Sequence, residues 1–212
     1  TPIIFTQRET AELIKYAANS FLATKITFIN EISDLCEKVG ANVSDVSIGI
    51  GLDGRIGKKF LHPGPGYGGS CFPKDTLALV KTAQDNDSPL NLVEHVVKSN
   101  KNRKKNMYKR ILNALGKYEK KTISILGLTF KPNTDDMRDS PSLDLVPELI
   151  KRKCFLKLFD PEGMKEAKNI FKKFNKNIKW CNDLYDACKK SDALVILTEW
   201  NQFRSLDLKK LK

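Results

Sequence analysis

The sequence predicts an all-helical first domain followed by a parallel α/β domain. In the first half of the chain, apolar residues recur every three or four positions over long stretches, which is typical of amphipathic helices. After about Lys120, short runs rich in β-branched residues, such as TISILGL, alternate with helical segments. Such alternation is typical of a parallel sheet covered by helices. We therefore assign domains 1–118 and 119–212.

Four helices are expected in the first domain. The longest spans residues 9–39, contains no Pro or Gly, and is followed by Gly40, which is placed to end it. Its apolar residues form more than one stripe, so we expect several neighbours or a second subunit to cover it. A short helix follows with Ser44 as its cap. The last two helices, at 73–84 and 90–115, are separated by the turn-forming DNDSP.

The second domain is expected to alternate strands and helices. The expected strands span 122–128, 154–159, 178–181 and 193–198, and the expected helices span 142–152 and 163–174. This order describes a Rossmann-like topology. The first strand runs into GLTFKPNTDDMR, which has a single glycine and lacks the further glycines of a dinucleotide-binding turn. The topology alone therefore assigns no ligand.

Composition is that of a folded protein from a reducing compartment. Hydrophobic residues make up 41% of the chain and charged residues 29%, which is ordinary for a globular domain. No apolar run approaches the roughly 20 residues of a membrane span, and the opening TPIIFTQRE does not resemble a signal peptide. We expect a cytoplasmic protein without membrane contact. Five cysteines without a C-x-x-C pair, beside two histidines, argue against a disulfide scaffold or a metal site.

Positive charge is concentrated in one segment. The net charge is +12, and residues 98–121 carry ten Lys and Arg against one acidic residue. Such a field attracts polyanions, including nucleotide substrates. We do not expect nucleic acid as a partner, because no aromatic stacking pattern or recognition motif accompanies the charge, and a solvated helix face explains it.

One glycine motif looks like a dinucleotide fingerprint and is not interpreted as one. GIGLDG at 49–54 matches G-x-G-x-x-G, and Asp75 lies 21 residues after Gly54. That fingerprint requires a preceding strand and a following helix, so that the pyrophosphate meets the helix N-terminus. Here a short helix precedes the motif, and RIGKKFLHPGPG, which is too broken to form a helix, follows it.

The segment GPGYGGSCFPKDT at 64–76 places a cysteine between a glycine loop and a helix. Pro73 suits the first turn of a helix, so Cys71 should lie near the helix N-terminus, where the dipole favours the thiolate and Asp75 opposes it. Asp75 is four residues on and can share a helix face with the thiol. The alternative is a buried structural cysteine beside a turn. Lys15 and Asn19 are also four apart and together can stabilise an oxyanion, although, taken alone, a solvated surface pair explains them better.

Four segments together carry a resemblance to a known family. AELIKYAANSFLATKITFINE, LDGRIGKKFLHPGPGYGGSCFPKDT, ILGLTFKPNTDDMRDSPS and ALVILTEWNQF resemble the UDP-glucose 6-dehydrogenase family in the same order along nearly the whole chain. The resemblance implies oxidation of the C6 alcohol of UDP-glucose to the carboxylate of UDP-glucuronate, with NAD as the cofactor.

The resemblance also implies that this chain is a fragment. Family members begin with an NAD-binding Rossmann domain and continue to a final strand and an arginine that contacts the nucleotide. This sequence has no initiator Met and no segment corresponding to either part. We expect the central helical domain and most of the C-terminal nucleotide-sugar domain, inactive without the rest.

The resemblance implies which residues are catalytic. The thiolate of Cys71 would capture the intermediate aldehyde as a thiohemiacetal, which is oxidised to a thioester and hydrolysed. Lys15 and Asn19 would stabilise the negative oxygen, and Asp75 would position or activate water.

It also assigns binding residues. The substrate would contact His62, Gly64, Gly66, Tyr67, Gly68, Phe130 and Lys131. NAD would contact Lys74 and Arg138. Arg55 corresponds to an arginine that enters the partner subunit's site, so a homodimer through the long N-terminal helix is implied.

Three alternatives stay open at this point. Sister enzymes acting on UDP-N-acetylmannosamine or GDP-mannose share the mechanism, but LATKITFINE and RIGKKFLHPGPGYGGSCFPKDT look more like the glucose branch. A non-catalytic oligomerisation or nucleic-acid-binding module is disfavoured because the whole catalytic group is present. A cysteine acyl hydrolase lacks a base, since His62 lies in the glycine loop and His95 on a separate helix.

Overall fold

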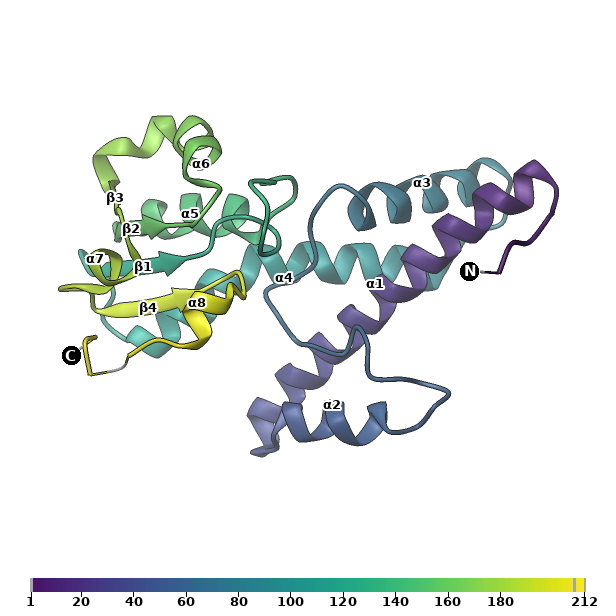
Figure 1. The fold of residues 1–212 in the computed structure, drawn as a ribbon, viewed down its shortest axis with the longest axis horizontal. Coiled ribbons are helices and arrows are strands. Elements are labelled where there is room, and N and C mark those ends of the chain that lie inside the picture. Colours follow the sequence, from purple (N-terminus) through teal and green to yellow (C-terminus); the bar gives the residue numbers. More distant parts are fainter. Residues whose placement is uncertain (1, 208, 212) are drawn as a thin grey trace. The chain divides into compact units, whose positions relative to one another are not determined.

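The computed structural model describes residues 2–207 and 209–211 and consists of two compact units, which divide between Lys101 and Asn102 (Figure 1). The first unit is helical and the second is built on a parallel sheet, as the sequence predicts. Helix α4 (Asn91–Leu115) runs without a break through the division. For this reason the domain boundary after residue 118 stays a prediction.

The first unit begins with the long helix that the sequence predicts. Helix α1 (Arg8–Val39) ends at Gly40, whose left-handed φ of 74° turns the chain out of the helix. Helix α2 (Val43–Gly51) follows. Ser44 does not cap it: the cap is Asn42, whose side-chain oxygen accepts the Ser44 N–H at 2.9 Å. Asn42 has the extended backbone of a cap residue, whereas Ser44 already lies inside the helix.

Helix α3 (Phe72–Asp85) packs against α1, and Figure 1 shows it alongside the N-terminal half of that helix. Its ends agree with the predicted helix to within one residue. The face toward α1 is unusual because polar residues, Asp75 and Thr76, are buried there together with Leu79 and Ala83. A long loop connects α2 to α3.

The second unit contains a four-stranded parallel sheet. Its strands are β1 (Thr122–Leu126), β2 (Phe155–Phe159), β3 (Ile178–Trp180) and β4 (Ala193–Ile196), in the order β3-β2-β1-β4. The chain moves outward from β1 to β3 and then returns to the other side of β1. This reversal makes a topological switch point beside the carboxyl end of β1, where ligands bind in open α/β sheets.

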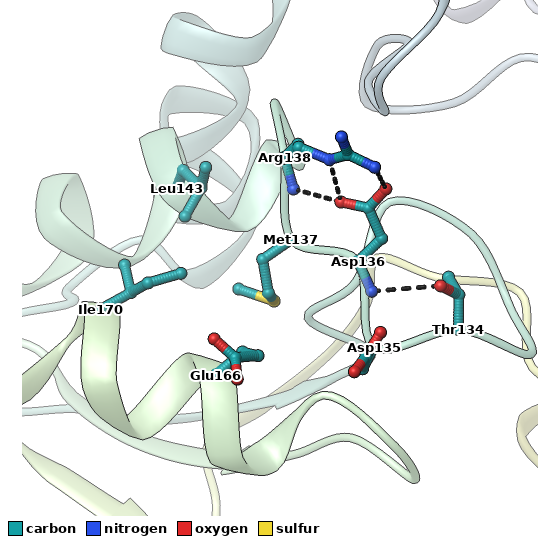
Figure 2. A pocket seen from close by; sticks show the side chains of 8 residues that line it. All are labelled: Thr134, Asp135, Asp136, Met137, Arg138, Leu143, Glu166 and Ile170. Atoms are coloured by element: carbon teal, nitrogen blue, oxygen red, sulfur yellow. Dashed lines mark hydrogen bonds and ion pairs between the residues drawn. The ribbon is translucent and has the colours of Figure 1, made fainter.

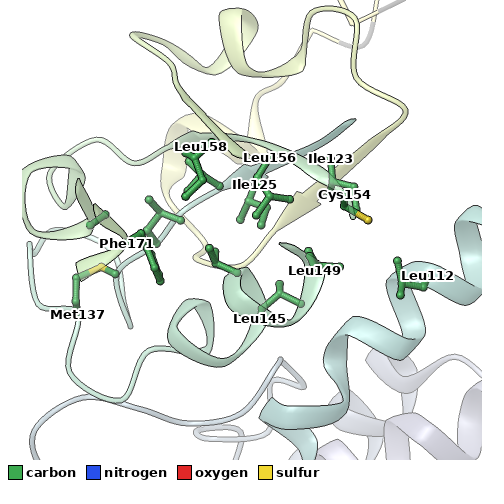
Figure 3. Packing of buried hydrophobic residues seen from close by; sticks show 14 residues of the cluster. Leu112, Ile123, Ile125, Met137, Leu145, Leu149, Cys154, Leu156, Leu158 and Phe171 are labelled. Atoms are coloured by element: carbon green, nitrogen blue, oxygen red, sulfur yellow. The ribbon is translucent and has the colours of Figure 1, made fainter. Parts of the chain in front are cut away.

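Helices cover both faces of the sheet. Ile123 and Ile125 of β1 point to one face, where they join a core with helix α5 (Pro141–Lys151), helix α6 (Met164–Ile170) and the C-terminal part of α4 (Figure 3). Leu126 joins a second cluster on the other face. The central strand β1 is buried at four of its five positions, with Ser124 among its apolar residues.

Two helices of the second unit were not predicted. Helix α7 (Leu184–Cys188) and helix α8 (Asn201–Arg204) contribute to the second cluster and are shorter than two turns, so they show no readable apolar period. The helix predicted at 163–174 is α-helical only to Ile170 and continues as the 3₁₀ helix η1 (Lys172–Asn177). No helix within the described parts of the chain is both long and apolar enough to span a bilayer.

A buried carboxylate holds the carboxyl edge of the sheet together. Asp160, directly after β2, accepts the backbone N–H groups of Leu128 at 2.6 Å and Gly163 at 2.7 Å. Thr198, after β4, donates its hydroxyl to the carbonyl of Thr129 at 2.5 Å. These contacts join the turns that follow β1, β2 and β4, and so they fix the segment in which Phe130 and Lys131 lie.

We predict that Gly127→Ala strongly destabilises the protein. Gly127 has φ +85°, and an added Cβ would lie 2.5 Å from the Thr198 Cβ and 2.7 Å from the Thr198 backbone nitrogen. Backbone strain and steric overlap together should cost about 3 kcal/mol. Gly116→Ala is the matched control, because Gly116 has φ +67° but open space around it, and should cost about 1 kcal/mol. Denaturant unfolding measures both, and equal losses would contradict the steric argument.

Candidate active site

The first unit brings three of the expected catalytic residues together. Asp75 on α3 is completely buried, and its Oδ2 accepts a hydrogen bond from the Asn19 side-chain amide at 2.6 Å. The Lys15 ammonium lies 3.6 Å from the same oxygen. Lys15 and Asn19 are one turn apart on α1, so one face of that helix presents a cation and an amide to one carboxylate.

The other carboxylate oxygen of Asp75 is differently placed. Its Oδ1 is buried and receives no hydrogen bond from the part of the chain that the structure describes. The ammonium of Lys74 lies 3.7 Å from it. A buried carboxylate is costly unless hydrogen bonds or cations compensate for the lost water. Oδ1 therefore has the capacity to accept a hydrogen bond from a water molecule or a substrate group.

Cys71 is the exposed cysteine of the protein. It is the residue directly before α3, and the hydroxyl of Ser70 lies 3.7 Å from its thiol sulfur. The other four cysteines are buried. Burial raises the pKa of the Cys154 and Cys188 thiols, and it raises the pKa of Cys181 to about 11. Reactivity toward a solvent-borne electrophile therefore falls to Cys71.

The glycine loop that precedes Cys71 is anchored by two buried asparagines. The side-chain oxygen of Asn30, on α1, accepts the Gly64 N–H at 2.7 Å. Asn100, on α4, accepts the Tyr67 N–H at 2.8 Å and donates to the Tyr67 carbonyl at 3.0 Å. Neither residue was predicted from the sequence as part of the site. The available signal was a polar residue at a position that the helical period assigns to the buried face.

The loop itself needs its glycines. Gly66 and Gly69 have φ values of 122° and 84°, which other residues rarely adopt. Between them, the buried Tyr67 side chain packs in a cluster with Ala23 and Val96. Gly68 is partly exposed, and His62, at the start of the segment, is exposed. The expected substrate-lining residues from His62 to Gly68 thus form one continuous segment, whose tyrosine packs inward.

Arg55 lies on a separate exposed turn. Its guanidinium donates to both carboxylate oxygens of Asp53, with Nη2 2.6 Å from Oδ2. This hydrogen bonding raises the pKa of Arg55 and lowers the pKa of Asp53. Lys25 on α1 donates to the backbone carbonyls of Ile56 at 2.8 Å and Gly57 at 3.2 Å, which ties the turn to α1.

The second unit places two expected substrate residues just beyond the carboxyl end of β1. The Lys131 ammonium lies 5.2 Å from the centre of the Phe130 ring. The Thr129 hydroxyl donates to the Lys131 carbonyl at 3.0 Å and so holds the turn. An exposed cation beside an aromatic ring at the switch point suits a nucleotide ligand, which offers negative phosphates and a stacking base.

Arg138 lines a pocket of about 600 Å³ in the second unit (Figure 2). Its Nε and Nη2 donate to the two oxygens of Asp136 at 2.9 Å and 2.7 Å. The hydrogen bonds from Arg138 hold the pKa of Asp136 below its usual range. Met137, Leu143 and Ile170 supply apolar lining.

The expected site residues therefore fall into two groups, one in each unit. Cys71, Lys15, Asn19, Asp75 and Lys74 belong to the first unit with Arg55 and the glycine loop, and Phe130, Lys131 and Arg138 belong to the second. Among residues 2–207 and 209–211, His, Cys, Asp and Glu form no group of three that would hold a metal ion.

Comparison with known proteins assigns both units to one family. The central domain of the UDP-glucose/GDP-mannose dehydrogenase family matches residues 9–102, and the UDP binding domain of the same family matches residues 124–212. The chain belongs to the UDP-glucose/GDP-mannose dehydrogenase family.

Several of the proteins that resemble this chain are UDP-glucose 6-dehydrogenases. The chain is 59% identical to the UDP-glucose 6-dehydrogenase of Rhizobium meliloti over its whole length, which covers 48% of that protein. It is 46% identical to UDP-glucose 6-dehydrogenase TuaD of Bacillus subtilis, covering 45% of that protein. The solved UDP-glucose dehydrogenase of Pyrobaculum islandicum superposes on 98% of this chain and 47% of its own, with a TM-score of 0.91 and 32% identity. The chain thus spans about half the length of the curated relatives it matches.

We predict that iodoacetamide modifies Cys71 before the other four cysteines at pH 8. Cys71 is exposed, whereas a pKa of about 11 leaves about one Cys181 in a thousand as thiolate at that pH. Peptide mapping after partial labelling identifies the first site. The chain unfolded in guanidinium is the control, in which all five cysteines should react. Faster labelling of Cys154 or Cys181 in the folded chain would contradict the assignment.

Proposed function

We propose that this chain forms the substrate-oxidising part of an NAD-dependent UDP-glucose 6-dehydrogenase, which converts UDP-glucose to UDP-glucuronate. The observation that carries the proposal is the exposed Cys71 at the start of α3, one turn before a buried Asp75 that Asn19 and Lys15 hold. The similarity to proteins named UDP-glucose 6-dehydrogenase supports the glucose branch over sister enzymes for other nucleotide sugars.

Cys71 supplies the covalent step of the proposed reaction. Its thiolate adds to the carbonyl carbon of the C6 aldehyde, a C–S bond forms, and the carbonyl electron pair moves to oxygen. Oxidation of this thiohemiacetal leaves a thioester. Water then attacks the thioester carbon, the thiolate leaves, and the water oxygen stays in the carboxylate product. Covalent capture keeps the reactive aldehyde from escaping between the two oxidations.

Lys15 and Asn19 are suited to stabilise the negative charge that forms on the carbonyl oxygen when the thiolate adds. Lys15 is a cation with its side chain 62% exposed, so it can reach toward a substrate while it remains 3.6 Å from Asp75. The hydrogen bond to Asp75 orients the Asn19 amide in advance, and preorganised donors stabilise developing charge most effectively. The Oδ1 of Asp75 is suited to receive a proton from the attacking water.

NAD supplies the hydride acceptor when it is bound. Of the residues present, Lys74 and Arg138 fit a peripheral role toward its phosphates, because both are exposed cations. GIGLDG does not fit the dinucleotide, since it forms the end of α2 and the turn after it rather than a strand-to-helix turn. We therefore propose that a separate NAD-binding domain belongs to the part of the relatives that this chain does not match.

A homodimer through α1 is part of the proposal. Ile14, Phe21, Phe28 and Leu35 recur every seven residues along α1 and are between 50% and 66% exposed. Seven residues are two helical turns, so these side chains form one stripe of the kind that packs helix against helix. A second copy of α1 would cover the stripe, and the partner's Arg55 would then complete each site.

A reducing, cytoplasmic setting agrees with five free cysteines.

Removal of the thiol should separate binding from conversion. In the protein restored to the length of its relatives, Cys71→Ala should abolish NADH formation from UDP-glucose, because the aldehyde cannot be captured. Binding of UDP-glucose, measured by calorimetry, should change less than about twofold. Cys36→Ala is the control for loss of a cysteine and should retain turnover. The 212-residue chain alone should not reduce NAD. If the restored wild-type protein oxidises no nucleotide sugar, the dehydrogenase proposal is wrong.

The α1 stripe predicts the oligomeric state. Sedimentation at micromolar concentration should find a dimer, and Phe21→Glu should shift it to monomer, because a carboxylate would be buried without a partner. Leu92→Glu introduces the same charge at an exposed position near the start of α4 and should leave the dimer intact. A monomeric wild-type protein would remove the proposed role of Arg55 across the interface.

A further inference from the structure

Both main-chain polar groups of Tyr67, in the glycine loop, bind the side chain of Asn100. Asn100 is 6% exposed and lies on α4, 33 residues along the chain from Tyr67. Its amide oxygen accepts the Tyr67 N–H at 2.8 Å, and its amide nitrogen donates to the Tyr67 carbonyl at 3.0 Å. The amide therefore satisfies both main-chain groups of one residue, as a neighbouring strand would.

This anchor lies where the loop has least structure of its own. Gly66 and Gly69, with φ values of 122° and 84°, flank the anchored segment and cannot form a regular ladder. The Tyr67 side chain is buried, so Asn100 and the apolar cluster fix this residue through its main chain and side chain together. From Tyr67 the chain needs four residues to reach Cys71, a span of at most about 14 Å.

We propose that Asn100 is a positioning residue for nucleotide-sugar oxidation. Acting through Tyr67, it sets the direction of the loop's main-chain N–H groups, which can donate hydrogen bonds to the hydroxyl oxygens of the hexose, and it limits the freedom of Cys71. The inference rests on the proposed function and deepens it. The position requires an amide, because the site needs one acceptor and one donor side by side in a buried place.

Asn100→Asp is the sharpest test, since it preserves shape and acceptor while it removes the donor and sets a carboxylate against the Tyr67 carbonyl. In the protein restored to the length of its relatives, we expect the KM for UDP-glucose to rise about tenfold or more at pH 8 and kcat to fall less than about threefold. Donors that bind substrate and transition state alike act chiefly on KM.

The pH profile gives a second readout. Once protonated, the carboxyl group that Asn100→Asp introduces would again donate to the Tyr67 carbonyl, so the KM ratio of Asn100→Asp to wild type should shrink from pH 8 to pH 6. Hydrogen exchange of the loop amides should be faster in the variant at pH 8. Asn102→Asp is the matched control, because Asn102 is exposed on the same helix, and should change neither KM nor exchange.

Each outcome decides a separate point. A variant with the wild-type KM, or with a KM ratio that does not depend on pH, would overturn the positioning role. A fall in melting temperature with parallel losses in kcat and kcat/KM, and no rise in KM, would reduce Asn100 to a structural residue and also overturn it. Absence of turnover in the wild-type protein would instead overturn the proposed function, and the exchange measurement would still decide whether Asn100 orders the loop.

Discussion

The buried carboxylate of Asp75 is the constraint on which the first unit depends. A charge without access to water must be met by specific partners, and here they come from one face of α1. The 2.6 Å hydrogen bond to Asn19 fixes how α3 lies along α1, because a shift of either helix by one turn would leave the carboxylate without its donor. With α3 fixed, its first residues are fixed too, and so is Cys71 directly before them.

Helix α1 also controls the segments that lead to the thiol. Lys25 holds the turn after Arg55, and Asn30 holds Gly64 at the beginning of the glycine loop. The residues that meet Asp75 and those that anchor the loop thus occupy successive turns of one helix. A rigid helix sets the spacing of such groups more accurately than a loop does. The long loop between α2 and α3 needs little regular structure, because side chains from α1 and α4 bind its main chain.

Long helices with a clear apolar period and strands with an apolar composition could be predicted from the sequence. Short helices, and residues whose role depends on a single tertiary contact, could not. The bounds of α1, α3 and α4 follow from apolar spacing, β1 follows from a run with β-branched residues, and β2 follows from a short run rich in Leu and Phe. Helices α7 and α8 are too short to show a period, and Asn42 competes with Ser44 as a cap through a backbone conformation that the sequence does not display. Lys15, Asn19 and Asp75 could be selected as a group, but their meeting at one carboxylate required the packing of α3 on α1. Asn100 could be noticed as a polar residue on the buried face of its helix, but its role shows only beside the main chain of Tyr67.

Charge balance explains why one buried acid suits this site better than none. The ammonium groups of Lys15 and Lys74 lie 3.6 Å and 3.7 Å from the carboxylate oxygens of Asp75, so the three side chains together carry a net charge of +1. A Cys71 thiolate would neutralise that charge. When the thiolate adds to a carbonyl carbon, the negative charge passes from sulfur to oxygen, so the sum does not change during capture. With Asp75 buried and both lysines exposed, the cations remain in place while solvent and carboxylate moderate their field. In the proposed reaction, the carboxylate would thus allow Lys15 to stabilise the negative charge on the substrate oxygen.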